Sequence, residues 1–295
     1  MHADEIDVAE QLVRRLLADQ FPQWAGLRLE RVASSGTDNA LYRLGHDLAV
    51  RLPRIPAAVG QVEKDQRWLP MLAPQLPLTV PAPLAVGAPG AGYPWTWGIY
   101  RWLPGQEAGM ERFADPDLAA RDLAGFLRAL QLVETADGPR GRARGSGRGA
   151  PLTGRDQDTR QAIAELRGEI DVSAVTAAWQ ESLAARPHDG ALRWIHGDLM
   201  PSNLLVSDGR LSAVIDFSCL GVGDPACDLV PAWNLFSARS RHIFRAELDV
   251  DADAWARGRG WALSLALIAL PYYLTTNPGI VAVSRRAIDA VLNYR

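Results

Sequence analysis

Two short polar runs on either side of a predicted hairpin constrain the fold more than any other feature. Residues 196–203, His-Gly-Asp-Leu-Met-Pro-Ser-Asn, lead directly into an apolar segment, and a second apolar segment ends just before Asp216. The sequence Ser-Asp-Gly at 207–209 lies between the two segments and is typical of a turn. In a hairpin, the loop before the first strand and the loop after the second lie at the same end. We therefore expect Asp198, Asn203 and Asp216 to lie close together.

Two carboxylates and an amide oxygen in one place suit phosphoryl transfer. One carboxylate can accept a hydrogen bond from the attacking hydroxyl, while the other carboxylate and the amide oxygen hold Mg²⁺ against the phosphates. Magnesium prefers hard oxygen ligands and keeps several waters, so two side chains plus the phosphates suffice. An isolated Asp-x-x-x-x-Asn run is usually a solvated turn. Here a second motif follows at the right separation, which favours a catalytic site.

The sequence resembles the aminoglycoside and macrolide phosphotransferase family, relatives of the protein kinases, over roughly residues 27–295. Residues 196–203 resemble the catalytic loop of that family, with Gly197 where protein kinases have arginine. The run Ile-Asp-Phe-Ser at 215–218 resembles the metal-binding Asp-Phe-Gly element, with serine in place of glycine. The run Gly-Asp-Pro-Ala-Cys-Asp at 223–228 is similar to the Gly-Asp-Pro-x-x-Asp run of these antibiotic kinases.

The resemblance implies a reaction and a role for each polar residue. It implies transfer of the γ-phosphate of ATP or GTP to a hydroxyl of a small molecule, such as a macrolide-like or aminoglycoside-like antibiotic. Asp198 is the implied catalytic base, and Asn203 and Asp216 are the implied Mg²⁺ ligands. We expect Asp228 to hold the catalytic loop through hydrogen bonds and His196 to orient it.

The N-terminal part of the chain predicts a small antiparallel sheet. From Leu27 to Leu52, apolar residues recur with period two in three runs separated by turns, which is typical of a three-strand meander. Apolar residues with helical spacing predict a helix at 4–20 and another near 58–72. A further strand is expected at 95–103, after a proline-rich stretch of loop and edge strand.

The pair Pro104-Gly105 marks the expected boundary between two lobes. We predict an α+β, bilobal protein-kinase-like fold, with a nucleotide-binding lobe of small antiparallel sheet at 1–103 and a mostly helical catalytic and acceptor-binding lobe at 104–295. In the second lobe, Asp115-Pro116 is a good helix start. More helix is expected at 156–186 and at 251–294.

The first lobe offers a cation and a carboxylate for the nucleotide. Arg51 lies where kinases have lysine, and its guanidinium can bind phosphate oxygens. Asp65 shares the apolar face of the helix near 58–72 and is the expected partner of Arg51, whereas Glu63 points elsewhere. The turn at 34–39 can present backbone N–H groups to phosphates, and the strand ending at 103 resembles the hinge that binds the base. The expected nucleotide-binding residues are Arg51, Asp65, Ser35, Gly36, Thr37, Arg101 and Leu103.

The acceptor is predicted from charge. The resemblance to the antibiotic kinases implies that the segment between the first helix of the second lobe and the catalytic loop helps to wall the acceptor site. This segment carries arginines that would repel a polycation. These arginines are Arg140, Arg142, Arg144, Arg148, Arg155 and Arg160. The C-terminal helices contribute bulky aromatic residues that suit a larger, less charged ring but could equally be core, Trp261 above all; they are Trp255, Trp261, Tyr272 and Tyr273. The pattern favours a macrolide-like acceptor with at most one or two amines, although the acidic run at 247–253 argues the other way.

Composition bears on compartment and partners. The net charge is −3, so nothing in the global field recruits nucleic acid or an anionic membrane. The most apolar stretch, 261–274, is too short to span a bilayer and is expected to be a buried helix. The N-terminal residues show no signal-peptide pattern, and only two cysteines occur, so we expect a cytoplasmic location.

Four alternatives remain open from the sequence. A protein kinase is disfavoured because no Ala-Pro-Glu run follows Asp216. A catalytically impaired, nucleotide-binding regulatory module is suggested by Arg51 and the degenerate phosphate turn, but the three catalytic-loop and metal residues are intact. RNA binding through 140–148 lacks aromatic residues for stacking on bases. A kinase of an ordinary hydroxylated metabolite is the fourth alternative.

Overall fold

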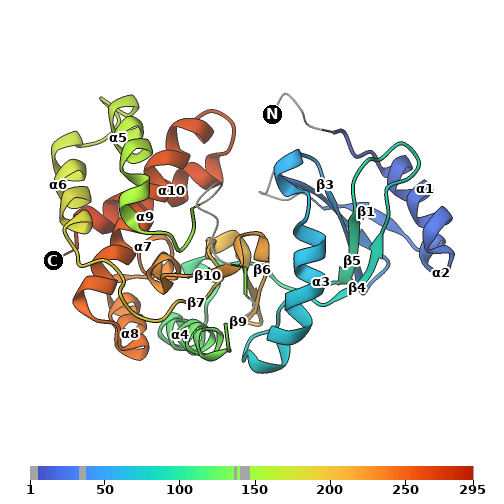
Figure 1. Ribbon diagram of the computed structural model, residues 1–295, viewed down its shortest axis with the longest axis horizontal. Helices are drawn as coiled ribbons and strands as arrows, with labels where there is room; N and C mark the ends of the chain where they lie inside the picture. Colours follow the sequence, from blue (N-terminus) through green and yellow to red (C-terminus); the bar gives the residue numbers. More distant parts are fainter. Residues whose placement is uncertain (1–5, 33–37, 136–137, 140–146, 295) are drawn as a thin grey trace. The chain divides into compact units, whose positions relative to one another are not determined.

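The computed structural model describes residues 6–32, 38–135, 138–139 and 147–294. The chain forms two compact units, one of residues 1–74 with 79–104 and the other of 75–78 with 105–295 (Figure 1). The first unit is built around a sheet and the second is mostly helical, which confirms the predicted α+β class.

The first unit contains one five-stranded antiparallel sheet in the order β1-β2-β3-β5-β4. Its strands are β1 (Leu29–Arg31), β2 (Asn39–Leu44), β3 (Leu48–Pro53), β4 (Pro83–Gly87) and β5 (Trp97–Arg101). The predicted meander is therefore present, and Gly45 with φ +61° makes the tight turn between β2 and β3. Within the described parts of the chain, β4 pairs with β5 alone and forms an edge of the sheet, where Leu84 and Val86 are exposed.

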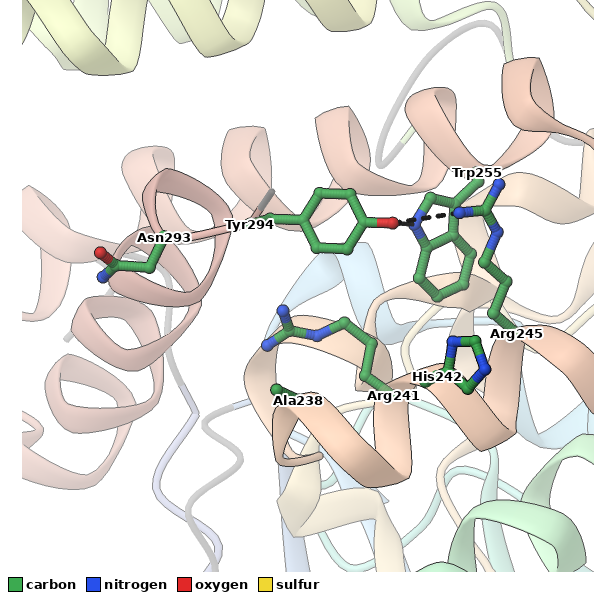
Figure 2. Close-up of a pocket in the computed structure, with 7 residues that line it drawn as sticks. All are labelled: Ala238, Arg241, His242, Arg245, Trp255, Asn293 and Tyr294. Carbon is green, nitrogen blue, oxygen red and sulfur yellow. Dashed lines mark hydrogen bonds between the residues drawn. The ribbon is translucent and has the colours of Figure 1, made fainter.

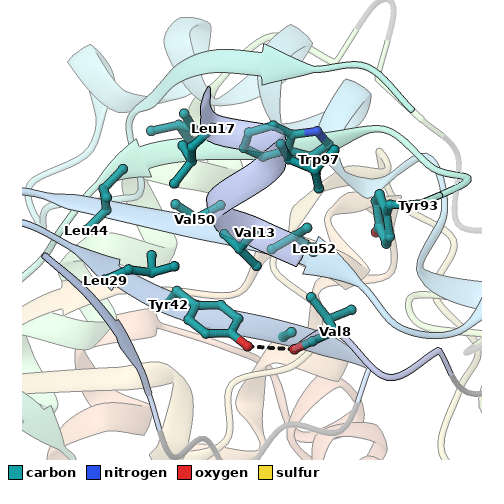
Figure 3. Packing of buried hydrophobic residues seen from close by; sticks show 13 residues of the cluster. Val8, Val13, Leu17, Leu29, Tyr42, Leu44, Val50, Leu52, Tyr93 and Trp97 are labelled. Carbon is teal, nitrogen blue, oxygen red and sulfur yellow. Dashed lines mark hydrogen bonds between the residues drawn. The ribbon is translucent and has the colours of Figure 1, made fainter. Parts of the chain in front are cut away.

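Period-two alternation along β3 divides the unit into two faces. Val50 and Leu52 point into an apolar core with α1 (Glu10–Gln20), while Arg51 between them points to α3 (Gln61–Leu72). Figure 3 shows this core around Tyr42 and Trp97. A short helix, α2 (Pro22–Ala25), follows α1.

The first helix begins later than predicted. The pattern indicated a helix over 4–20, but α1 begins at Glu10, and no helix covers residues 6–9. The backbone before α1 is bound to the sheet instead. The Ile6 N–H donates to the Arg54 carbonyl at 2.8 Å, and the Tyr42 hydroxyl donates to the Val8 carbonyl at 2.6 Å. These tertiary hydrogen bonds outweigh the local helical pattern.

The second unit combines two small sheets with seven α-helices among its described residues. One sheet has the order β6-β8-β9 and the other pairs β10 with β7. The strands are β6 (Gln106–Glu107), β7 (Arg193–Ile195), β8 (Leu204–Ser207), β9 (Arg210–Val214) and β10 (Gly221–Gly223). The helices are α4 (Pro116–Leu132), α5 (Asp156–Glu165), α6 (Val172–Leu183), α7 (Pro231–Asn234), α8 (Ala238–Leu248), α9 (Ala252–Tyr273) and α10 (Pro278–Leu292).

Local capping explains several helix ends in this unit. The Asp115 carboxylate accepts hydrogen bonds from the backbone N–H groups of Asp117 and Leu118, so α4 begins where the sequence predicted. The single helical region expected at 251–294 is interrupted before Pro278. Asn277 precedes this proline, which disfavours helical backbone, and its side chain caps α10 instead.

The longest helix, α9, is buried on most of its surface. It packs against α10, α5, α6 and the short turn at 225–229. Trp255 and Trp261 are 3% and 0% exposed. The burial of Trp261 agrees with the buried helix expected at 261–274, and Trp255 also belongs to the core, which the sequence had left open, rather than to an exposed acceptor surface. Nowhere in the described part of the chain is a helix both long enough and apolar enough to cross a membrane.

Candidate active site

The β8–β9 hairpin brings the predicted catalytic residues together. Leu204 pairs with Val214, and the Ile215 N–H donates to the Asn203 carbonyl at 2.9 Å, so Asn203 lies beside the residue that precedes Asp216. The Asn203 amide nitrogen donates to the backbone carbonyl of Asp198 at 2.8 Å and to its carboxylate Oδ2 at 3.1 Å. The hairpin thus sets the ends of both polar runs side by side, as expected.

A buried carboxylate holds the backbone just before Asp198. Asp228 is 0% exposed, and its two oxygens accept the backbone N–H groups of His196 at 2.8 Å and Gly197 at 2.7 Å. Burial raises the pKa of Asp228, while His196 and these two N–H groups oppose the rise. The expected anchoring contacts of Asp228 are present.

The imidazole of His196 connects the two loops. Its Nε2 lies 3.0 Å from the Ile215 carbonyl, which can only accept, so Nε2 carries the proton. Its Nδ1 accepts the backbone N–H of Asp198 at 3.2 Å. The ring also packs edge-on against Phe217, with centroids 4.6 Å apart. One tautomer satisfies both hydrogen bonds, consistent with an orienting role.

Asp216 adopts a left-handed backbone conformation, with φ +59°. Aspartate is among the few residues other than glycine that adopt this conformation regularly, because its short side chain can bond locally. Here Oδ1 accepts the N–H of Ser218 at 3.2 Å. The strained backbone fixes the direction of the carboxylate immediately after the hairpin.

The side chains beside the hairpin fit a magnesium ion. Because the amide nitrogen of Asn203 is turned to Asp198, its oxygen faces away from that carboxylate. Asp216 supplies an anionic oxygen two residues after β9. One carboxylate and one amide oxygen form a hard donor set of the kind that Mg²⁺ prefers over nitrogen or sulfur.

Arg148 was expected only as an arginine of the acceptor wall, and the sequence did not predict its contact with Asp198. Its Nη2 lies 3.0 Å from Asp198 Oδ1, and its side chain is only 14% exposed. Burial disfavours the charged guanidinium, but the Asp198 carboxylate and the nearby thiols of Cys219 and Cys227 raise the pKa of Arg148 overall. The signal in the sequence was Gly197, which leaves the catalytic loop without the arginine of protein kinases.

The predicted ion pair of the first unit is present. Arg51 Nη1 lies 3.1 Å from Asp65 Oδ2, and Arg51 Nη2 donates to the Gln61 side chain at 2.5 Å. The Tyr100 hydroxyl donates to the same Asp65 oxygen at 3.0 Å. Two donors thus hold a carboxylate that is almost fully buried, and the carboxylate in turn holds Arg51.

The other predicted nucleotide-binding residues differ in what the structure says of them. Arg101 is exposed at the end of β5, where its backbone N–H donates to the Ala82 carbonyl, and Leu103 is half-buried. Ser35, Gly36 and Thr37 lie outside the described residues. A nucleotide-binding role for these five residues stays a prediction.

The described arginines of the expected acceptor wall bind other side chains of the protein. Arg160 Nε bonds Asp156 at 2.8 Å, and Arg155 Nε donates to Ser264 Oγ at 2.8 Å while its guanidinium stacks over Trp261. Burial lowers the pKa of Arg155 to about 10, and the nearby Arg148 adds to the fall. Arg140, Arg142 and Arg144 lie outside the described residues. Arg148, Arg155 and Arg160 therefore do not form the free basic surface that we predicted.

A cavity of about 330 Å³ lies elsewhere in the second unit, between α8 and the ends of α9 and α10 (Figure 2). Its lining includes Arg241, Arg245, Trp255 and Tyr294. Of these, Trp255 was considered for the acceptor, and none was predicted as a catalytic, metal-binding or nucleotide-binding residue. The Tyr294 hydroxyl accepts hydrogen bonds from Arg245 and Trp255, and Arg241 donates to the Ala232 carbonyl. These side chains connect α8 to the ends of α9 and α10. Helix α8 also packs against α4, which in turn packs against the strands β7 and β9.

Comparisons with known proteins agree with the geometry. Residues 30–261 match the family described as "Phosphotransferase enzyme family". The fold is similar to that of APH(2'')-IIIa in complex with GDP and kanamycin, with a TM-score of 0.73, 19% identity and coverage of 95% of this chain and 97% of that chain. It is also similar to a macrolide 2'-phosphotransferase from Brachybacterium faecium, with a TM-score of 0.59, 25% identity and coverage of 97% and 98%.

A curated relative adds a different acceptor to this list. A homoserine kinase from Granulibacter bethesdensis is 30% identical over 132 residues, which are 38% of this chain and 40% of that protein. The match thus spans less than half of the relative's own length. The family match, in contrast, covers most of the chain, including every described site residue of the second unit from Arg148 to Asp228. The chain therefore belongs to the phosphotransferase enzyme family and has the kinase-like fold of its antibiotic-modifying members.

Proposed function

We propose that this protein transfers the γ-phosphate of ATP or GTP, with Mg²⁺, to a hydroxyl group of a small molecule. The contact of Asn203 with the Asp198 carboxylate, directly beside Asp216, carries the proposal. It joins a candidate base to one candidate metal ligand, and the hydrogen bond from the Ile215 N–H to the Asn203 carbonyl brings the second candidate ligand, Asp216, next to them in the chain. Phosphoryl transfer needs a base and metal ligands close together. Cys219 and Cys227 carry reduced thiols, which together with the nucleotide donor supports a cytoplasmic location.

Asp198 accepts the hydrogen bond of the acceptor hydroxyl and orients its oxygen toward the γ-phosphorus. As the new O–P bond forms, the bond from phosphorus to the bridging β–γ oxygen breaks, and the nucleoside diphosphate leaves. The hydroxyl proton passes to the Asp198 carboxylate and then to solvent. Asn203 and Asp216 would hold Mg²⁺, which neutralises phosphate charge when bound. Arg51, held by Asp65, is the proposed cation for the phosphates of the donor.

For the acceptor we propose a hydroxylated antibiotic, of the macrolide or aminoglycoside kind. Support comes from two similar structures, one in complex with kanamycin and one of a macrolide 2'-phosphotransferase. Since the described arginines are engaged and Trp255 and Trp261 are buried, neither feature selects between the two kinds. A hydroxylated metabolite is the second candidate, because the curated relative is a homoserine kinase.

The test is phosphate transfer from ATP and from GTP to a panel of macrolides, aminoglycosides and hydroxyl amino acids, with product detected by mass. We expect Asp198→Asn to lower kcat by about 10²–10⁴ while the affinity for Mg·nucleotide is kept, since only the positioned base is lost. Asp189→Asn, at a highly exposed carboxylate of the same unit, is the matched control. Wild-type kcat in Asp198→Asn would contradict the mechanism. Nucleotide binding without transfer to any acceptor would favour the regulatory-module alternative.

A further inference from the structure

We propose that Arg148 positions the Asp198 carboxylate for the acceptor hydroxyl, and that the catalytic loop has glycine at 197 to admit this arginine. This inference rests on the proposed phosphotransferase function. Arg148 comes from the glycine- and arginine-rich segment before α5, and the contact joins residues 50 positions apart in the chain. Arg148 is thus a positioning residue that acts through Asp198.

Among the residues that the structure describes, each oxygen of the Asp198 carboxylate has one hydrogen-bond partner. Oδ1 accepts from Arg148 at 3.0 Å and Oδ2 accepts from Asn203 at 3.1 Å, so the plane of the carboxylate is fixed from both sides. Each carboxylate oxygen can accept a second hydrogen bond, which leaves room for a substrate hydroxyl. An ionised donor also makes the stronger kind of hydrogen bond to a carboxylate.

The exposed fractions of the two side chains show whether Arg148 supports the Asp198 carboxylate or blocks the substrate. The Arg148 side chain is 14% exposed, while that of Asp198 is 25% exposed. Two nitrogens of the guanidinium, Nε and Nη1, are fully buried. The arginine therefore supports the carboxylate from the protein side. A side chain that blocked the substrate would be the more exposed member of the pair.

The backbone at Gly197 fits this arginine closely. A Cβ atom at position 197 would lie 3.2 Å from the Arg148 Cβ and 2.8 Å from the Cys219 carbonyl oxygen. The φ of Gly197 is +81°, a value that side chains rarely adopt. Protein kinases carry an arginine at this position of the loop itself. Here the loop has no side chain at position 197, and Arg148, which comes from another segment, lies beside this position.

A pair of facing glycines fixes the segment that carries Arg148. The Asp224 N–H donates to the Gly149 carbonyl at 2.9 Å. A Cβ on Gly149 would lie 3.0 Å from the Gly223 Cα, and a Cβ on Gly223 would lie 2.6 Å from the Gly149 oxygen. Backbone therefore touches backbone at the residue after Arg148. The run at 223–228, which contains Gly223 and Asp224, also contains Asp228. The Asp228 carboxylate holds the backbone of the catalytic loop at His196 and Gly197.

The test compares Arg148→Met, which keeps much of the length and removes the charge, with Arg148→Lys and with Arg285→Met as the control. Arg285 lies on α10 of the same unit and makes a half-exposed ion pair with Glu169. We expect Arg148→Met to lower kcat about 10²-fold, the typical cost of a carboxylate misplaced by about 1 Å, with Mg·nucleotide Kd unchanged. Arg148→Lys should recover part of the loss, because the charge remains although the fork of donors does not. Arg285→Met should match wild type.

A chemical-rescue measurement separates positioning from simple structural support. In Arg148→Ala the truncated side chain leaves space for a guanidinium ion, so millimolar guanidinium should raise kcat while tetramethylammonium should not. If Arg148→Met does not fold, rescue of Arg148→Ala decides alone, and failure of rescue overturns the proposal. Wild-type kcat in Arg148→Met also overturns it, without touching the proposed function. An inactive wild-type protein would overturn both.

Discussion

Removing the carboxylate of Asp228 should weaken both stability and catalysis. In Asp228→Ala, the backbone N–H groups of His196 and Gly197 lose their acceptors, at 2.8 and 2.7 Å, in a place with no exposure to solvent. Each buried, unpaired N–H costs about 1–3 kcal/mol, so the two cost about 2–6 kcal/mol. Burial disfavours the charged carboxylate and raises the pKa of Asp228, so the loss of this buried charge offsets part of the cost of the two unpaired N–H groups. We expect a net loss of about 2–4 kcal/mol, a large share of the usual 5–15 kcal/mol.

The assay is urea denaturation together with hydrogen exchange of the His196 and Gly197 amides. In the variant, these two amides should lose protection even in the folded state, and kcat should fall about 10²-fold because Asp198 follows directly. Asp189→Ala, at a side chain that is 76% exposed, is the control for loss of one carboxylate. Unchanged protection of both amides, with a urea midpoint equal to that of the control, would refute this reasoning.

Three further predictions follow from the ion pairs and ligands described above. Asp216→Ala should abolish Mg²⁺-dependent nucleotide binding in calorimetry, because only the neutral amide of Asn203 remains. Asp216→Asn removes the charge alone, because asparagine, like aspartate, adopts the left-handed backbone conformation. Arg51→Ala should raise the KM for nucleotide strongly and Arg51→Lys only partly, since lysine keeps the charge; wild-type kinetics for both variants would exclude a phosphate role. The Ser240 hydroxyl, with Arg239, lowers the pKa of Asp117, so this carboxylate stabilises the fold above its unfolded pKa of 3.8 and loses that effect as pH falls below it. The difference in urea midpoint between wild type and Asp117→Asn should therefore be full at about pH 7 and shrink by about pH 3.

The local parts of the site could be predicted because hairpin geometry determines them. Once the turn at 207–209 is recognised, the residues before β8 and after β9 must lie together, and Asn203 does contact Asp198. The Arg51–Asp65 pair is similar, since alternation along β3 and helical spacing along α3 each give one direction. The kinase-like fold followed from the resemblance of the motifs and is confirmed by the structural comparisons.

Contacts between distant segments could not be predicted. Arg148 reaches Asp198 across 50 positions, and no periodicity encodes such a pairing. Whether Trp255 and Trp261 are core or acceptor surface stayed open for another reason. Helix α9 is apolar around most of its circumference, so its sequence has no polar face to show which aromatic residues are buried. The start of α1 depended on hydrogen bonds to the sheet, which the local pattern does not contain.

The position of β4 at the sheet edge has a consequence for self-association. Its outer side offers backbone groups to a further strand, and the exposed Leu84 and Val86 would add apolar contact to such a pairing. Pro83 removes one N–H donor, and an irregularity in the register between Pro83 and Ala85 bends the ladder. These two features act against edge-to-edge aggregation. Val86→Lys would place a charge on the exposed side of β4 and should further reduce aggregation in concentrated solution. The substitution would leave the apolar core around Tyr42 and Trp97 unchanged.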